Sequence, residues 1–292
     1  MSHRDDLREA ADALGGSVVV CGLGAHADRL AGAEFRDARY ASGAELLAEA
    51  SSASSTGPAP AAVVVALDPE TVGEGAEATD ALRAIDALDA FAVAVVPAAA
   101  AEGDALAAVR ESVDAVLLAE GDAVEAAIRA FLATVQEPGF VNLDLTDAET
   151  VLSAGVAALG TGAADRDDPS VAVASAFDRL PDGVDAAEAS AVLVDVVVDP
   201  ATSIAAATDV IAAVRERIGA DANVIWGGAV DEAAADELAV RLVVAGVRHA
   251  PLLSAGDPCP RCGEPLASYR FGARETLSCD ACGYSDIAMR RG

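Results

Sequence analysis

The chain contains no lysine, and its 19 basic residues are all arginine. They stand against 48 acidic residues, which gives a formal net charge of −29. Aromatic residues make up only 3% of the sequence, but hydrophobic residues make up 53%, so we expect a folded protein with an aliphatic core. Acidic excess without lysine is typical of proteins that work in concentrated salt, because salt screens the self-repulsion of the surface. We therefore interpret most carboxylates as a hydrated surface.

The shortage of cations argues against several functions. Non-specific binding to nucleic acid or anionic lipid depends on arginine and lysine side chains that neutralise phosphates. The first residues, MSHRDDLREAADAL, lack the apolar centre of a signal peptide, and no apolar run reaches the 18 residues of a membrane span. We expect a cytoplasmic protein without a membrane span, and no nucleic-acid partner except through the C-terminal segment.

Apolar runs alternate with helical patterns in the first half of the chain. A β-branched run, VVVC, breaks at Gly22 and Gly24 and leads into a helical stretch. Cys21 in this run is interpreted as a buried structural thiol. Further buried strands are predicted at 60–68, 91–97 and 113–119, helices at 77–90 and 122–136, and a loop at 51–60. This alternation predicts an α/β fold, with a parallel sheet covered on both faces.

A second α/β domain is expected after Gly139. Helices are predicted at about 147–159, 171–180 and 203–219, a loop at 160–170, and strands at 191–199, 223–228 and 237–246. The short loops near the end favour antiparallel pairing of the last strands. The predicted domains are residues 1–120 (Rossmann-like), 121–137 (central helix), 138–250 (second α/β domain) and 251–292 (cysteine-containing segment).

Four of the five cysteines lie in the last 35 residues. Cys259 and Cys262 form one C-x-x-C motif, Cys279 and Cys282 form a second, and each pair is followed by glycine. Two such turns can hold one tetrahedral ion, which predicts a zinc ribbon with a structural Zn²⁺. Two disulfides or a redox dithiol are the alternatives, but a cytosolic location disfavours the first and the duplicated motif the second. With five arginines against four acids in 258–292, this segment lacks the negative excess of the rest.

The stretch GFVNLDLTDAETV, residues 139–151, changes from alternating apolar residues to a helical pattern. Thr146 and Glu149 fit a capping box, and Asp144 and Asp147 near a helix start would be stabilised by the helix dipole. Capping does not require Asn142 or the N-x-D-x-x-D spacing.

Three further patterns occur in order along the chain: PGFVNLDLTDAETVLS, the glycine-rich AALGTGAADRDD, and GADANVIWGGAVDEAAADELAVRLVVAGV. Together they resemble the FtsZ/tubulin superfamily, including its archaeal FtsZ and CetZ branches, and the similarity runs from about 121 to 247. The resemblance implies an FtsZ/tubulin-like fold with a central helix between two domains. It also implies that Asn142, Asp144 and Asp147 act at the GTP of a neighbouring subunit, where the acids orient water.

The first half departs from the family pattern in its phosphate loops. Gly22 and Gly24 are the remnant of the first glycine cluster, and the second loop reads LDPETVGEGAEATDAL in place of a run of glycines. Its four carboxylates, at residues 68, 70, 74 and 77, would repel a triphosphate, and there is no lysine to offset them. We do not expect GTP to bind in the chain's own pocket.

Three functional hypotheses follow. The first is a pseudo-GTPase that binds or regulates FtsZ- or CetZ-type filaments in cell division or cell shape, and is therefore not itself an enzyme. The second is a divergent GTPase that still binds GTP and polymerises with itself. The third is an adaptor whose functional part is the zinc ribbon on an FtsZ-like scaffold.

Overall fold

The computed structural model describes residues 18–51, 60–74, 76–101, 103–234, 236–249, 255–256, 259, 261–271 and 274–287. Contacts divide the chain into two units: the body, Met1–His249, and the ribbon, Ala250–Gly292. Most of the predicted loop at 51–60 lies outside the described residues. Among the helices that are described, none is long and apolar enough to cross a membrane.

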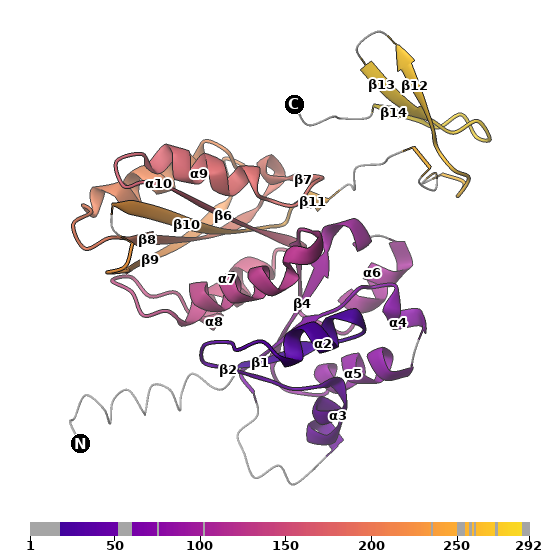
Figure 1. The fold of residues 1–292 in the computed structure, drawn as a ribbon, viewed down its shortest axis with the longest axis horizontal. Coiled ribbons are helices and arrows are strands. Elements are labelled where there is room, and N and C mark those ends of the chain that lie inside the picture. The colour runs from indigo at the N-terminus through magenta and orange to yellow at the C-terminus, as the bar shows by residue number, and fades with distance from the viewer. Residues whose placement is uncertain are drawn as a thin grey trace. The chain divides into compact units, whose positions relative to one another are not determined.

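A nine-stranded sheet forms the centre of the body, in the order β2-β1-β3-β4-β5-β6-β10-β8-β9 (Figure 1). Neighbouring strands are parallel except at β10, which is antiparallel to both β6 and β8. The strands are β1 (Val18–Gly22), β2 (Ala38–Tyr40), β3 (Ala62–Ala66), β4 (Phe91–Pro97), β5 (Ala115–Ala119), β6 (Ala157–Asp165), β8 (Ala191–Val198), β9 (Asn223–Val230) and β10 (Glu237–Ala245).

Helices cover both faces of the sheet, as the alternating pattern predicts. One face carries α3 (Gly43–Ser51), α5 (Ala76–Asp86), α6 (Gly103–Arg110), α9 (Pro169–Asp178) and α10 (Ala205–Arg215). The other carries α2 (Ala25–Ala31), α7 (Val124–Gln136) and α8 (Leu145–Leu152). A short helix, α4 (Thr71–Glu74), precedes α5. The predicted α/β class is therefore confirmed.

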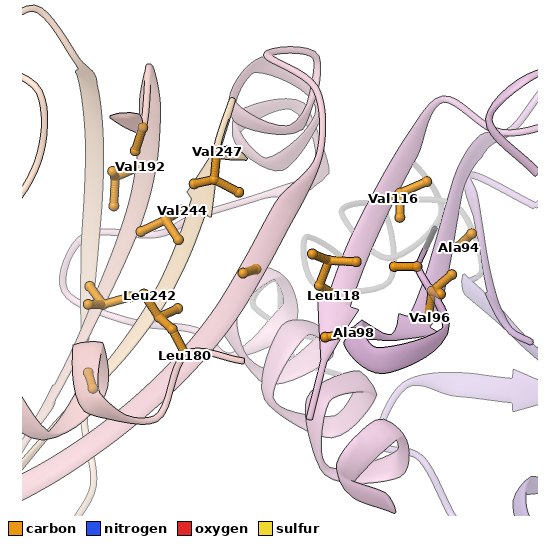
Figure 2. Packing of buried hydrophobic residues seen from close by; sticks show 14 of the residues in the cluster. Ala94, Val96, Ala98, Val116, Leu118, Leu180, Val192, Leu242, Val244 and Val247 are labelled. Carbon is orange, nitrogen blue, oxygen red and sulfur yellow. The ribbon is translucent and has the colours of Figure 1, made fainter. Parts of the chain in front are cut away.

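The aliphatic core runs through the whole sheet. Leu118 of β5 and Val244 of β10 belong to the same buried cluster (Figure 2). The two halves of the sheet join where β5 pairs with β6 through Leu117 and Leu118, opposite Ala157 and Ala158. The domain limits at 120 and 138 stay predictions, because they fall inside one unit with a continuous sheet.

The predicted loop at 160–170 is wrong, because most of it is strand β6. The segment AALGTGAAD lacks the β-branched residues of a typical strand, and its two glycines are typical of loops. A Cβ on Gly160 or Gly162 would lie 2.2 Å from a backbone oxygen of α9, that of Ala176 or Ala172. The glycines are therefore needed because α9 packs directly on the backbone of β6.

Other boundaries also differ from the predictions. The helix expected at 147–159 is α8, which begins at Leu145 and ends at Leu152. The last two strands do not pair with each other: β9 is a parallel edge strand beside β8, and β10 lies between β6 and β8. Strand β2 and helix α3 carry no clear pattern in the sequence and were not predicted.

Smaller sheets complete the fold. In the body, β7 (Val184–Asp185) pairs antiparallel with β11 (Arg248–His249). The ribbon contains a three-stranded antiparallel sheet of β12 (Ala267–Phe271), β13 (Arg274–Ser278) and β14 (Ser285–Ile287). The ribbon is therefore a small, separate unit of antiparallel strands.

Candidate functional site

The acidic loop, which we define as residues 139–147, lies along the edge strand β9. The backbone N–H groups of Phe140 and Val141 donate to the carbonyl of Gly228 at 2.9 and 3.3 Å, and the N–H of Gly228 donates to the carbonyl of Val141 at 2.9 Å. These bonds pair part of the exposed edge of the sheet and hold the first half of the loop on it.

Glycine makes this close approach feasible. A Cβ on Gly139 would lie 2.1 Å from the carbonyl oxygen of Gly228, and a Cβ on Gly228 would lie 2.4 Å from the ring of Phe140. A Cβ on Gly227 would lie 2.5 Å from the side chain of Leu143. The glycine pair in NVIWGG therefore fits the acidic loop, since any side chain there would push the loop off the strand.

The polar residues of the loop are tied to its backbone. Oδ1 of Asn142 accepts from the N–H of Gly139 at 2.8 Å. Asp144 is the N-cap of α8, and its Oδ1 accepts from the N–H groups of Thr146 and Asp147 at 2.8 and 3.0 Å. Oδ2 of Asp147 in turn accepts from the N–H of Asp144 at 3.1 Å, which completes a capping box.

The capping box predicted from Thr146 and Glu149 is therefore wrong. Aspartate is at least as good an N-cap as threonine, and a cap at Asp144 starts the helix two residues earlier. The two aspartates thus have a structural role that the sequence pattern had not assigned to them. Asn142 and Asp144 are still exposed and Asp147 is half-buried, so their outer faces remain open to solvent.

Exposed apolar side chains lie in the acidic loop and on the strand that it pairs with. Phe140 is 42% exposed, Val141 is 36% exposed, and Val230, two residues beyond Gly228 on β9, is 49% exposed. The sequence did not identify these residues as functional, because the alternation at 139–143 and the apolar run of β9 both looked like ordinary strand patterns. The solvent-facing surface of this loop is therefore partly apolar and partly acidic.

The loops after β1 and β3, where the resemblance locates the phosphates, pack against each other. Nε2 of the buried His26 lies 3.4 Å from Oδ1 of Asp68. Gly24 has a φ of 57°, and a Cβ placed on it would lie 3.3 Å from the side chain of Thr71. A Cβ on Gly22 would lie 2.5 Å from the carbonyl oxygen of His26. Gly22 and Gly24 thus permit a tight turn that is closed by contacts within the protein.

A cavity of about 450 Å³ lies elsewhere, at the amino ends of β3 and β4. Its lining includes Ala61, Phe91 and several carboxylates, among them Asp114. Ligands of parallel α/β sheets bind at the carboxyl ends of the strands, which is the opposite end. The cavity contains none of the site residues predicted from the sequence.

The four predicted metal ligands lie together in the ribbon. The sulfur atoms of Cys259, Cys262, Cys279 and Cys282 are all within 4.8 Å of one another. Two of the sulfur pairs are 3.6 Å (Cys259 and Cys282) and 3.4 Å (Cys262 and Cys279) apart. Tetrahedral Zn–S bonds place sulfur atoms about 3.8 Å apart, whereas a disulfide needs about 2.0 Å. The cluster therefore fits one zinc ion and not two disulfides.

Both C-x-x-C turns have the same backbone design. The N–H of Gly263 donates to the carbonyl of Cys259 at 2.8 Å, and that of Gly283 to the carbonyl of Cys279 at 2.9 Å. The φ angles of the glycines are 79° and 71°, which a side chain would strain.

The cysteines differ in acidity according to their surroundings. Burial raises the pKa of Cys279, but N–H groups from Cys282 and Ala281 and the thiol of Cys262 bring it down to about 7. A backbone N–H lowers the pKa of Cys262, but hydrogen bonds with the neighbouring thiols raise it to about 12, so Cys279 and Cys262 titrate as a pair. Burial raises the pKa of Cys21, in β1, to about 12, and its full burial agrees with the predicted buried structural thiol.

Comparisons with known proteins match both units. Residues 155–248 match the family model of the FtsZ family C-terminal domain, and residues 256–282 match that of a zinc finger found in FPG and IleRS. Cell division protein FtsZ 1 of Halobacterium salinarum is 39% identical over 115 residues, which are 39% of this chain and 29% of that protein. The match therefore spans less than a third of the relative's length.

Solved structures share the fold of the body. The FtsZ dimer of M. jannaschii superimposes with a TM-score of 0.64 at 18% identity, over 89% of this chain and 100% of that chain. CetZ from Methanosaeta thermophila superimposes with a TM-score of 0.54 at 15% identity, over 79% of this chain and 87% of that chain.

These findings define an FtsZ/tubulin-type fold with a small cysteine ribbon after it. The chain is therefore similar to the FtsZ family C-terminal domain over residues 155–248 and to a zinc finger over residues 256–282, and its body shares the fold of FtsZ and CetZ structures.

Proposed function

We propose that the chain is a pseudo-GTPase of the FtsZ type, which binds other FtsZ- or CetZ-type subunits without using a nucleotide of its own. It presents its acidic loop to the nucleotide-bearing face of another subunit and offers no competent face in return. In this role it caps, regulates or anchors filaments that serve cell division or cell shape. The observation that carries the proposal is the contact between the loops after β1 and β3.

The contacts between the loops after β1 and β3 support a closed pocket at this position and not an open phosphate-binding site. Gly24 packs against Thr71, and His26 against Asp68, where a triphosphate would need open backbone N–H groups. Asp68, Glu70 and Glu77 bring negative charge to the same loop and helix start. Each uncompensated like-charge contact costs on the order of 1 kcal/mol or more, and the chain has no lysine to offset it.

The surface of the acidic loop supports the docking half of the proposal. Phe140 and Val141 supply exposed apolar area in the same loop as Asn142 and Asp144, a combination that suits a protein interface with a partly apolar core and a polar rim. The relative from H. salinarum is named as a cell division protein, and the M. jannaschii FtsZ was solved as a dimer. We extend subunit association to this chain.

The experiment mixes the purified chain with FtsZ- and CetZ-type proteins of the same organism in molar KCl. We expect a change in their GTP turnover and in filament length, measured by phosphate release and electron microscopy. Asp144→Ala should weaken the effect, and Asp178→Ala, at an exposed aspartate on α9, serves as the control. Unchanged turnover and unchanged filaments would reject the proposal.

Equilibrium binding of labelled GTP to the chain alone tests the other part of the proposal, that the chain does not use a nucleotide of its own. We expect no saturable binding at micromolar GTP. Saturable binding would favour the second hypothesis, a divergent GTPase that polymerises with itself, in which Asp144→Ala lowers turnover without lowering affinity.

A chain that ends at residue 257 tests the adaptor hypothesis, because loss of localisation with retained filament effects would assign targeting to the ribbon.

A further inference from the structure

One arginine contacts two carboxylates close to the start of the acidic loop. Glu137 follows α7 directly, and its Oε2 accepts from Nη2 of Arg241 on β10 at 2.6 Å. Nη1 of Arg241 lies 3.1 Å from Oδ2 of Asp195 on β8, without hydrogen-bond alignment. The side chains of Arg241 and Asp195 are 17% and 6% exposed, so most of this cluster is buried.

Stability alone is a weak reason for such a cluster. Strand β8 reads AVLVDVVV and is buried along its whole length, and Arg241 lies in the apolar run of β10. Burying charges costs several kcal/mol per ion, and apolar replacements of similar volume are often as stable as the ion pairs they replace. A charge cluster in this place therefore suggests that a particular geometry is retained.

The geometry that the cluster fixes is the entry into the acidic loop. Glu137 lies two residues before Gly139, where the loop meets β9. At its other end the loop is fixed by the capping box of Asp144 and Asp147. Among the described residues, the bonds at Gly228 and the buried side chain of Leu143 tie the extended stretch between them to β9. The contact of Glu137 with Arg241 fixes the chain immediately before this stretch.

We propose that Arg241 is a positioning residue for the docking surface, by which we mean the exposed face of the acidic loop. Arg241 acts by holding Glu137, so that residues 139–143 stay on β9. The inference rests on the proposed function for the meaning of the surface, but the positioning itself is a property of this chain alone. Arg36 also approaches Glu137, at 3.5 Å, but it is 72% exposed, so its contact contributes little.

Hydrogen exchange of the isolated chain in molar KCl tests the positioning. In Arg241→Met and in Glu137→Gln, we expect the amides of Val141 and Gly228 to exchange about tenfold faster than in the wild type. The amides in the centre of β8 and β10 should accelerate clearly less than these two, although Arg241→Met leaves the buried Asp195 without its partner. Arg241→Lys should restore part of the protection, and Arg36→Met is the matched control that leaves exchange unchanged.

Exchange that is unaltered in both variants would overturn the inference, and so would a uniform acceleration across the sheet, which indicates a merely structural role. The filament assay then separates this inference from the proposed function. If exchange accelerates but even the wild type has no effect on filaments, the positioning stands and the proposed function fails. If the wild type and Arg241→Met affect filaments equally, the positioning role in docking fails and the proposed function stands.

Discussion

Asp195 is a carboxylate in the middle of a buried strand. Its pKa is raised to about 6, because burial and, to a smaller extent, Glu137 raise it by more than the neighbouring Arg241 lowers it. The penalty of burial therefore exceeds the attraction of the arginine. Since the ordinary value is 3.8, the folded state binds more protons than the unfolded state between that pH and about 6. The free energy of unfolding contributed by this group falls as the pH rises through that window.

Substitution of this residue gives a prediction for the pH dependence. Asp195→Asn cannot ionise, and Arg241 keeps its contact with Glu137. As the pH rises from about 4 to 7, we expect the wild type to lose stability relative to Asp195→Asn, by at most about 3 kcal/mol. Denaturant unfolding at several pH values measures it. Asp209→Asn, at an exposed aspartate, should show no such shift. A stability difference between Asp195→Asn and the wild type that does not change with pH would contradict the prediction.

The sequence identified some residues of the site and not others, for reasons of geometry. The cysteines and the acidic loop have fixed local spacings, so they could be found by pattern. Arg241 and Asp195 lie opposite each other only because β10 is inserted antiparallel beside β8. That register is a long-range property, and an arginine in ELAVRLVVA carries no local sign of it.

At the scale of elements, the start of α8 depends on the side chain of Asp144. Asp144→Ala removes the acceptor for two backbone N–H groups and should lower the free energy of unfolding by about 1 kcal/mol. Asp144→Asn keeps an acceptor oxygen, so it should stay within a few tenths of the wild type. Denaturant titration checks both, and equal stability of all three proteins would contradict the cap.

The same pair of variants separates capping from docking. Asn at position 144 preserves the helix start and removes the carboxylate charge. If docking onto another subunit depends on that charge, the filament effect is lost in Asp144→Asn although its stability is not. If only the shape of the loop matters, Asp144→Asn behaves as the wild type in the filament assay.

Strand β6 shows why part of the fold could not be predicted. Buried strands of the first half and helices α7, α9 and α10 follow from period and composition, but AALGTGAAD has the composition of a loop. Its strand state depends on α9 and on pairing with β5 and β10.

Gly162→Ala tests the packing of α9 on β6, because its Cβ would meet the backbone of α9 at 2.2 Å. We expect a loss of about 1 to 3 kcal/mol in the free energy of unfolding, measured by denaturant titration. Gly32→Ala, where nothing lies within 4 Å, is the control and should cost little. Equal stability of both variants would show that α9 can move away without cost.

At the scale of the molecule, the two units differ in what holds them together. The body has two extensive apolar clusters, one on each face of its sheet. In the described part of the ribbon, the buried cluster consists of Cys259, Leu266, Leu277 and Cys279. A unit of this size cannot bury enough apolar surface to fold on such a core alone. The metal must therefore supply much of the folding free energy of the ribbon.

Removal of zinc should then unfold the ribbon and leave the body folded. We expect one zinc per chain by elemental analysis, and its loss on chelation or on acidification, because the ligands must be thiolates. Trypsin should cleave at Arg261 only after chelation. Trp226, the single tryptophan, lies on β9 and reports on the body, whose unfolding midpoint should not change. Cys262→Ser should reproduce the effect of chelation. If chelation lowered the unfolding midpoint of the body, the ribbon would contribute to the stability of the body. A separate role for the ribbon would then have to be abandoned.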